Sequence, residues 1–263
     1  MTIRALLLSG LVLAAAPPLA REEATPVLLE LFTSEGCSSC PPADELLTRL
    51  AHDGSIKGVR VIPIGLHVDY WDALGWKDPL SSADATRRQQ TYAAALGVAD
   101  VYTPQMVVDG RDAFVGSDER LARQALERAA ARPHAKVGVR AAADRGTYSI
   151  AVDVASLPPD AAKEPLEAFA AIVEDGLTSV VKRGENGGRT LRHDAGLRRL
   201  IGLSRRSDAS YAVSGVRLQD GWNASRLTVV AFVQGRKTRA VWGAASAPLA
   251  VQERSSRLPE TRH

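Results

Sequence analysis

The chain has 263 residues, of which 45% are apolar and 24% are charged, with 21 glycines and 14 prolines. This composition is that of a soluble globular protein and excludes a collagen-like, coiled-coil or disordered chain. The formal net charge of +3 results from 33 basic and 30 acidic residues. Because this balance gives no argument for nucleic-acid binding, we expect no nucleic-acid partner.

The amino terminus has the layout of a secretory signal peptide. Arg4 precedes an apolar run over residues 5–16, and small residues and prolines follow up to Ala20. The run is shorter than the roughly 18 apolar residues that a bilayer span requires. We therefore predict that residues 1–20 direct export to the periplasm or the cell exterior, and that the mature protein has no membrane span.

The first half of the mature chain alternates between predicted strands and predicted helices. Apolar runs and a turn at Asp109-Gly110 predict strands over residues 27–32, 59–67, 106–108 and 114–115. Capping residues and amphipathic spacing predict helices over residues 43–50, 81–96 and 117–131. This alternation favours an open α/β layer structure.

Beyond Pro133 the pattern becomes all-β. Apolar residues alternate with small or polar ones from Tyr148 to Val154 and again from Leu227 to Val233, and residues 240–242 begin a last strand. An alternation of period two is typical of half-buried antiparallel strands. We predict a sandwich-like β domain over residues 134–250, followed by a loose tail over residues 251–263.

The two cysteines, Cys37 and Cys40, directly precede Pro41 and the first predicted helix. As a structural staple the pair would close a loop of about four residues, which contributes only about 2 kcal/mol in the chain-entropy treatment. A redox role is favoured, because the helix dipole stabilises a thiolate on Cys37 and Cys40 can resolve a mixed disulfide. We expect a thiol-disulfide oxidoreductase that acts on protein or small thiols, with the Cys37 sulfur open to solvent.

Residues 30–50, together with Thr103 and Pro104 before the strand at 106–108, resemble the thioredoxin fold. The resemblance covers roughly residues 26–131 and implies a mixed sheet with flanking helices. It also implies that Pro104 is a cis-proline against the disulfide and that Thr103 faces a bound substrate. An ordinary proline at the start of a strand fits the sequence as well.

Four motifs resemble a family of secreted thioredoxin-like proteins catalogued as domain of unknown function 1223 (DUF1223). They are Cys37-Ser38-Ser39-Cys40-Pro41-Pro42, His67-Val68-Asp69-Tyr70-Trp71-Asp72, Tyr102-Thr103-Pro104-Gln105 and Gly184-Glu185-Asn186. This resemblance covers nearly the whole mature chain and implies a fold but no substrate. The expected fold is therefore an α/β thioredoxin-like domain over 26–131 followed by the all-β domain over 134–250.

Glu30 lies within the apolar strand 27–32, where an unpaired charged carboxylate costs several kcal/mol to bury. By resemblance to thioredoxins, which keep a buried acid beneath the resolving cysteine, Glu30 is a candidate proton relay for Cys40. The alternative is an edge-strand glutamate that points to water.

His67 ends the second predicted strand, at the sheet edge where the cysteine loop is expected. With Cys37 and Cys40 it forms a soft ligand set suited to copper, which makes a copper-binding protein or chaperone the alternative function. The simpler interpretation is that His67 pairs with Asp69 or caps the next loop.

Tyr70 and Trp71 follow directly and could grip a peptide substrate, although core packing explains them equally well. We expect protein thiols or disulfides as partners and no cofactor, and the oligomeric state cannot be predicted. A third hypothesis is a non-catalytic interaction module, because a fold does not fix a function.

Overall fold

The computed structural model describes residues 24–52, 56–144 and 146–249. The predicted signal peptide and the predicted tail at 251–263 lie outside the described residues. Within the described part of the chain, no helix is long and apolar enough to cross a membrane.

Eight strands from both halves of the chain form one mixed sheet, in the order β14-β13-β7-β10-β2-β1-β3-β4. Their bounds are β1 Thr25–Thr33, β2 Val59–His67, β3 Gln105–Val108, β4 Asp112–Val115, β7 Leu166–Glu174, β10 Gly196–Gly202, β13 Leu227–Gly235 and β14 Val241–Pro248. Strand β2 runs parallel to β1 on one side and to β10 on the other, where Gly65 pairs with Gly196. The two halves of the chain therefore share one continuous sheet.

Three α-helices cover the part of the sheet around β1, namely α1 (Pro41–His52), α2 (Ala83–Leu96) and α3 (Glu119–Ala130). Leu29 and Leu31 of β1 pack in one core cluster with residues of α1 and α3, whereas Leu28 and Phe32 pack in another with residues of α2. Because side chains alternate along a strand, these two sets mark opposite faces. Strand β1 is apolar on both faces because both are covered.

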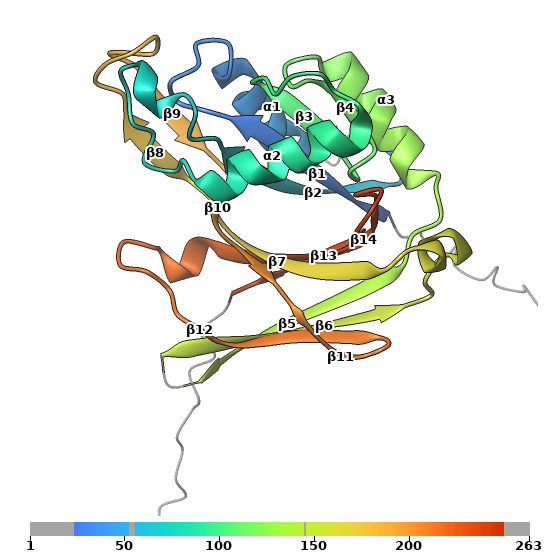
Figure 1. The fold of residues 1–263 in the computed structure, drawn as a ribbon. Helices are drawn as coiled ribbons and strands as arrows, with labels where there is room; N and C mark the ends of the chain where they lie inside the picture. Colours follow the sequence, from blue (N-terminus) through green and yellow to red (C-terminus); the bar gives the residue numbers. More distant parts are fainter. Residues whose placement is uncertain (1–23, 53–55, 145, 250–263) are drawn as a thin grey trace, which may run out of the picture.

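A second, four-stranded sheet lies at the other end of the molecule, in the order β11-β12-β6-β5 (Figure 1). Its strands are β5 (Lys136–Asp144), β6 (Thr147–Ala155), β11 (Ser204–Ser207) and β12 (Ser210–Val216). Ile150 and Val152 of β6 pack in one core cluster with Ile172 of β7 and Val229 of β13. A two-stranded hairpin, β8 (Leu177–Val180) and β9 (Thr190–His193), completes the described strands.

The predicted fold class is wrong. The described residues form fourteen strands against three α-helices, and the large sheet runs through both predicted domains instead of ending at a helix-flanked first domain. The physical reason lies in β7 and β13, where residues 170–173 and 229–233 are buried without interruption. A strand buried on both faces belongs in the middle of a covered sheet, so reading only the alternating residues of 227–233 missed half of the pattern.

The individual elements of the first half are confirmed. The predicted strands at 27–32, 59–67, 106–108 and 114–115 and the three predicted helices all correspond to described elements, with bounds that differ by a few residues. Asp109-Gly110 forms the turn between β3 and β4, and both residues have positive φ, of 45° and 63°. Local pattern therefore identified these elements correctly, while their assembly depended on the second half of the chain.

Candidate functional site

Cys37 and Cys40 form a disulfide at the start of α1. The Cys40 carbonyl accepts hydrogen bonds from the backbone N–H groups three and four residues further on, so the helix begins directly after it. Pro41 and Pro42, which have no N–H, occupy the first helical turn, where they are tolerated. The Ser39 hydroxyl oxygen lies 3.2 Å from the Cys37 Sγ. The helix dipole and this hydroxyl both stabilise a thiolate at Cys37 when the disulfide is open.

The Thr103–Pro104 peptide bond is cis, as the sequence resemblance implied. The Cys37 Sγ lies 3.9 Å from the Thr103 carbonyl oxygen, and the Thr103 hydroxyl accepts a 2.8 Å hydrogen bond from the Trp71 indole N–H. The Tyr70 hydroxyl instead donates to a glutamine of α2. The structure therefore brings Thr103 to the disulfide, with Pro104 next to it in the chain and Trp71 bonded to its hydroxyl, while Tyr70 is engaged with α2.

The turn between β8 and β9, residues 181–189, covers the disulfide loop; we call it the cover turn. Its Asn186 Nδ2 donates to the backbone carbonyls of Glu35 and Cys37, both at 2.9 Å, and the Glu185 carboxylate accepts the Ser38 N–H at 2.9 Å. The two cysteines are 1% and 0% exposed. The expectation that the first sulfur is open to solvent is therefore wrong. Ser39 and Thr103 lie beside the sulfur, and the cover turn, about 150 positions further along the chain, holds the backbone of the loop.

Five buried titratable residues flank the disulfide loop; we call them the acid–histidine cluster. They are Glu35, Asp44, His67, Asp78 and His193. The Asp78 carboxylate contacts the His67 Nδ1 at 2.6 Å and accepts the Glu35 N–H at 2.8 Å. Burial alone would raise the pKa of Asp78, but the His67 ring and these hydrogen bonds outweigh it and hold that pKa below its usual value. The two imidazole rings meet edge to face, with centroids 4.6 Å apart.

Asp44 is the acid of this cluster whose pKa is raised. Burial raises its pKa from 3.8 to about 7, and the negative charges of Asp78 and Glu35 act in the same direction. The His193 ring and the nearby Thr33 hydroxyl oppose the rise. The Asp44 Oδ2 lies 3.9 Å from the His193 Nδ1. The sequence analysis missed this acid, because Asp44 has the position of an ordinary acidic residue in the first helical turn, where the helix dipole stabilises a negative charge.

The structure does not bring Glu30 to the cysteines. Its carboxylate contacts the Arg88 guanidinium at 2.5 and 2.9 Å and accepts a 2.5 Å hydrogen bond from the Tyr92 hydroxyl. Both partners lie on α2, which covers the face of β1 opposite to α1. Glu30 is therefore neither beneath Cys40 nor exposed at an edge, but is buried in an ion pair.

The copper alternative receives no support. The His67 Nδ1 is engaged with Asp78, not with Asp69, whose carboxylate contacts a threonine of α2. Over the described ranges of the chain, no group of three or more histidine, cysteine or acidic side chains is arranged to hold a metal ion.

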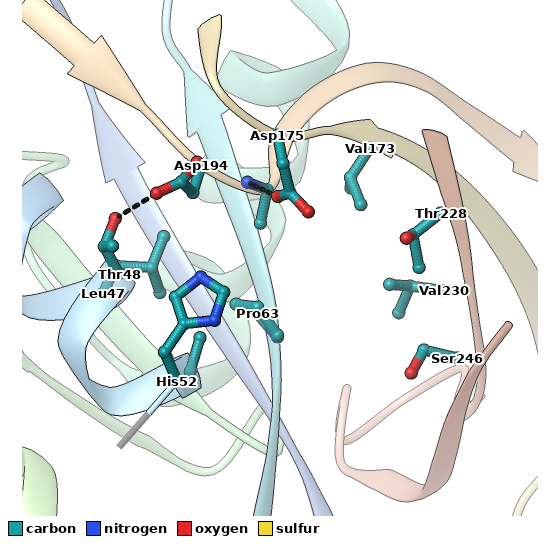
Figure 2. Close-up of a pocket in the computed structure, with 12 residues that line it drawn as sticks. Leu47, Thr48, His52, Pro63, Val173, Asp175, Asp194, Thr228, Val230 and Ser246 are labelled. Atoms are coloured by element: carbon teal, nitrogen blue, oxygen red, sulfur yellow. Dashed lines mark hydrogen bonds between the residues drawn. The ribbon is translucent and has the colours of Figure 1, made fainter. Parts of the chain in front are cut away.

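Figure 2 shows a cavity of about 160 Å³ beside the carboxyl-terminal half of α1. Thr48 and His52 line it from the helix, and Asp175 and Asp194 line it from the strand ends. The Asp194 carboxylate is satisfied by the Thr48 hydroxyl at 3.1 Å and by a backbone N–H at 2.8 Å. No cysteine lines this cavity, so it is separate from the disulfide site.

The fold and the site define a mainly β protein, built on a mixed eight-stranded sheet, with a buried C-x-x-C disulfide at a helix start beside a cis-proline. The chain belongs to the DUF1223 family, described as a protein of unknown function, whose family model matches residues 28–234. A search of curated proteins found no match.

The solved structures that match the chain include the following three. Protein AGR_C_4864 from Agrobacterium tumefaciens is 26% identical with a TM-score of 0.62, covering 87% of this chain and 96% of that one. HBP35 of Porphyromonas gingivalis is 16% identical with a TM-score of 0.65, covering 91% and 81%, and shares the fold alone. A domain of the outer membrane lipoprotein Omp28 from Porphyromonas gingivalis is 16% identical with a TM-score of 0.30, covering 46% and 91%. That last likeness carries no argument.

Proposed function

We propose that the chain is a thiol-disulfide oxidoreductase whose redox centre is the Cys37–Cys40 disulfide. The observation that carries the proposal is the position of the Cys37 Sγ, at the positive end of α1 and 3.9 Å from the Thr103 carbonyl oxygen. A disulfide that joins residues only three positions apart contributes little to stability. A thiolate held at a helix start is instead the arrangement that thiol-disulfide exchange requires.

The reaction exchanges two electrons with a dithiol substrate. A substrate thiolate attacks the Cys37 Sγ, a mixed disulfide forms, and the Cys37–Cys40 bond breaks with its electron pair on the Cys40 sulfur, which takes up a proton. The second substrate thiolate then attacks the substrate sulfur of the mixed disulfide and releases the Cys37 thiolate. The substrate is oxidised to a disulfide and the protein is reduced; the reverse sequence reduces a substrate disulfide.

We expect the disulfide loop or the cover turn bonded to it to move before a protein substrate reaches the sulfur, because Cys37 is buried. A substrate that displaces the turn would meet Thr103 and Trp71 next to the reacting sulfur. We place the reaction outside the cytoplasm, on protein thiols or disulfides. The signal-like segment at residues 1–20 supports this location, and a persistent disulfide is compatible with an oxidising compartment.

Single-cysteine variants test the assignment of the two sulfurs. Cys40→Ser leaves the Cys37 thiol and Cys37→Ser leaves the Cys40 thiol, so each variant is the matched control of the other. We expect the thiol of Cys40→Ser to react with an aromatic disulfide reagent at least about tenfold faster near neutral pH, because helix dipole and hydroxyl stabilise its thiolate. Equal, slow rates and no mixed disulfide with a disulfide-bonded peptide would overturn the proposal in favour of a non-catalytic interaction module.

A further inference from the structure

We propose that a cavity between the start of α2 and strand β10 binds a small hydroxylated carboxylate, with Arg199 as the residue that receives the carboxylate group. We call it the arginine cavity. The inference goes beyond the proposed function and does not depend on it, because neither cysteine and no member of the acid–histidine cluster lines this cavity. Its volume is about 300 Å³, well above the roughly 30 Å³ that one water molecule occupies in the liquid.

Three segments that are far apart in the chain enclose the arginine cavity. The segment before α2 and the first turn of that helix line one side, at residues 79–84. Strand β10 lines the second side through Arg198 and Arg199, and the connection between β12 and β13 lines the third through Gln219 and Trp222. The cavity is therefore a product of the fold, and no local sequence pattern announces it.

A β-bulge brings two successive arginines to the same place in the cavity wall. The register between β10 and β7 shifts between Leu197 and Arg199, so Arg198 is an extra residue in the strand. In a regular strand, neighbouring side chains point to opposite faces, and a bulge changes the direction of a side chain. Here both guanidinium groups lie over the Trp222 ring, with their central carbons 5.6 and 5.7 Å from its centroid. The bulge therefore directs two positive charges to one tryptophan.

The two arginines differ in their partners. The Arg198 Nε donates to the Glu174 carboxylate at 2.8 Å. The same carboxylate accepts the Asn223 N–H at 3.1 Å and so ties the β12–β13 connection to the bulge. The Arg199 Nη1 donates to the Arg217 backbone carbonyl at 3.3 Å, and no carboxylate among the described residues pairs with Arg199. Arg199 is therefore held in position by a ring and a carbonyl, with its charge left for a ligand.

The cavity lining carries one uncompensated positive charge. Among the described residues that line it, Asp84 is the acid, and its carboxylate pairs with Arg87 three residues further on. Arg198 is compensated by Glu174. A guanidinium presents its N–H donors in a plane that matches the two oxygens of a carboxylate. One free guanidinium fits the single negative charge of a carboxylate better than a phosphate group, which carries nearly two charges at neutral pH.

The rest of the lining is suited to hydroxyl groups on the ligand. Ser82 and Gln219 offer side chains that can both donate and accept hydrogen bonds. The Ser82 hydroxyl oxygen accepts the Ala85 N–H as a helix cap, which leaves its hydrogen to donate. Leu197 and Leu200 close the inner side, where they pack with the core cluster of β1 and β2. The ligand class is therefore a small carboxylic acid whose body carries hydroxyl groups, such as a sugar acid.

The test follows the indole N–H signals of the protein by NMR during titration with glucuronate. The chain has four tryptophans, and the Trp222 signal is the one that Trp222→Phe removes. We expect this signal to shift saturably, with a dissociation constant of about 1 mM or below. Glucose has the same ring without the carboxylate, so it should bind at least about tenfold more weakly, because the charge-assisted contact with the guanidinium is lost.

Arg199→Met removes the free guanidinium and keeps an aliphatic side chain. We expect the variant to fold, because no carboxylate is left unpaired, and its affinity for glucuronate to fall at least about tenfold. Arg199→Lys, which keeps the charge but not the planar donors, should lose less. Arg206→Met is the matched control, because Arg206 is an exposed arginine of β11 that does not line the cavity. It changes the net charge equally and should leave the affinity unchanged.

The inference is overturned if the wild-type Trp222 signal shows no saturable shift up to about 20 mM glucuronate, or if glucose binds as tightly. It also fails if Arg199→Met keeps the wild-type affinity, or if Arg206→Met loses as much, since binding would then reflect net charge alone. Tighter binding of inorganic phosphate than of glucuronate would overturn the assignment to a carboxylate. Should Arg199→Met not fold, the comparison of glucuronate with glucose on the wild type decides.

Discussion

At the scale of single residues, two buried acids on opposite sides of β1 have opposite environments. Glu30 faces α2 and is neutralised by the Arg88 guanidinium, whose side chain is itself almost fully buried. Asp44, on α1, has no arginine or lysine partner within the described structure and shares a pocket of carboxylates with His193. The same chemical group therefore forms a buried ion pair in one place and lies among other acids and a histidine, with a raised pKa, in the other.

Glu30→Gln tests the structural assignment. The substitution leaves the Arg88 guanidinium buried without its countercharge, and breaking such a pair costs about 3 kcal/mol or more. We expect chemical denaturation to show this loss of unfolding free energy. We also expect the rate of exchange with a small thiol to stay at the wild-type value at a temperature where the variant is folded. A slowed exchange in a stably folded variant would return Glu30 to the redox site.

Asp44 also predicts how stability depends on pH. Its pKa is about 7 in the folded protein against 3.8 as the ordinary value, so the folded state binds the proton more tightly than the unfolded chain. The contribution of Asp44 to stability is therefore greatest below about pH 4, falls as pH rises to about 7 and is level above. Between about pH 5 and pH 8 we expect the wild type to lose about 3 kcal/mol relative to Asp44→Asn.

Denaturant unfolding of both proteins at the two pH values measures this difference. Asp100→Asn, at an exposed position, serves as the control and should track the wild type. If Asp44→Asn follows the wild type across the same range, Asp44 does not titrate near neutral pH.

At the scale of elements, the β8–β9 hairpin completes the site that α1 begins. One end of its cover turn binds the disulfide loop through Asn186 and Glu185, and β9 places His193 in the acid–histidine cluster. The glycines at 184 and 188 have positive φ, of 78° and 84°, which glycine adopts without strain. The sequence places these residues about 150 positions after the cysteines, so no local pattern connects them.

Asn186→Ala tests whether this turn controls access. The substitution removes both hydrogen bonds to the Glu35 and Cys37 carbonyls, so the turn should open more often. We expect a small dithiol to reduce the disulfide several-fold faster, because hydrogen bonds of this kind contribute about 1 kcal/mol each. Asn223→Ala removes the capping asparagine of a turn elsewhere and should leave the rate unchanged. An unaltered rate in Asn186→Ala would show that the turn does not limit access.

How much the sequence could predict at this scale depends on how far apart in the chain the interacting residues lie. The helix start after Cys40 and the strands on either side were accessible, because short motifs and apolar runs specify them. The cis state of Pro104 was accessible only through the resemblance to the thioredoxin fold. The face on which Glu30 lies was not, because β1 is apolar on both faces and offers no alternation to read. Asn186 and His193 were also out of reach, since their contacts to the disulfide loop depend on the path of the whole sheet.

At the scale of the molecule, the continuous sheet makes the two halves interdependent. Strand β2 has β1 on one side and β10 on the other, and the core cluster of Leu28 and Phe32 extends to Val230 and Phe232 of β13. The predicted division into two independent domains overlooked these pairings, because parallel contacts between distant strands leave no short-range signal.

A truncated chain tests this interdependence. Residues 24–133 keep β1 to β4 and all three α-helices but lose β10, the cover turn and the strands that bury Phe32. We expect no cooperative thermal transition and strong binding of a hydrophobic dye, because one side of the core is exposed. A sharp, reversible transition in this fragment would show that the first half folds on its own.

The most direct test of the central claim is the equilibrium of the Cys37–Cys40 pair with glutathione redox buffers, followed by quenching and counting of free thiols. A redox-active pair should equilibrate with these buffers and give a reduction potential above about −300 mV. Cys37→Ser, which cannot form the bond, defines the reduced baseline. A pair that stays fully oxidised in the most reducing buffers, with a potential far below about −300 mV, would be an inert structural bridge and would contradict the account.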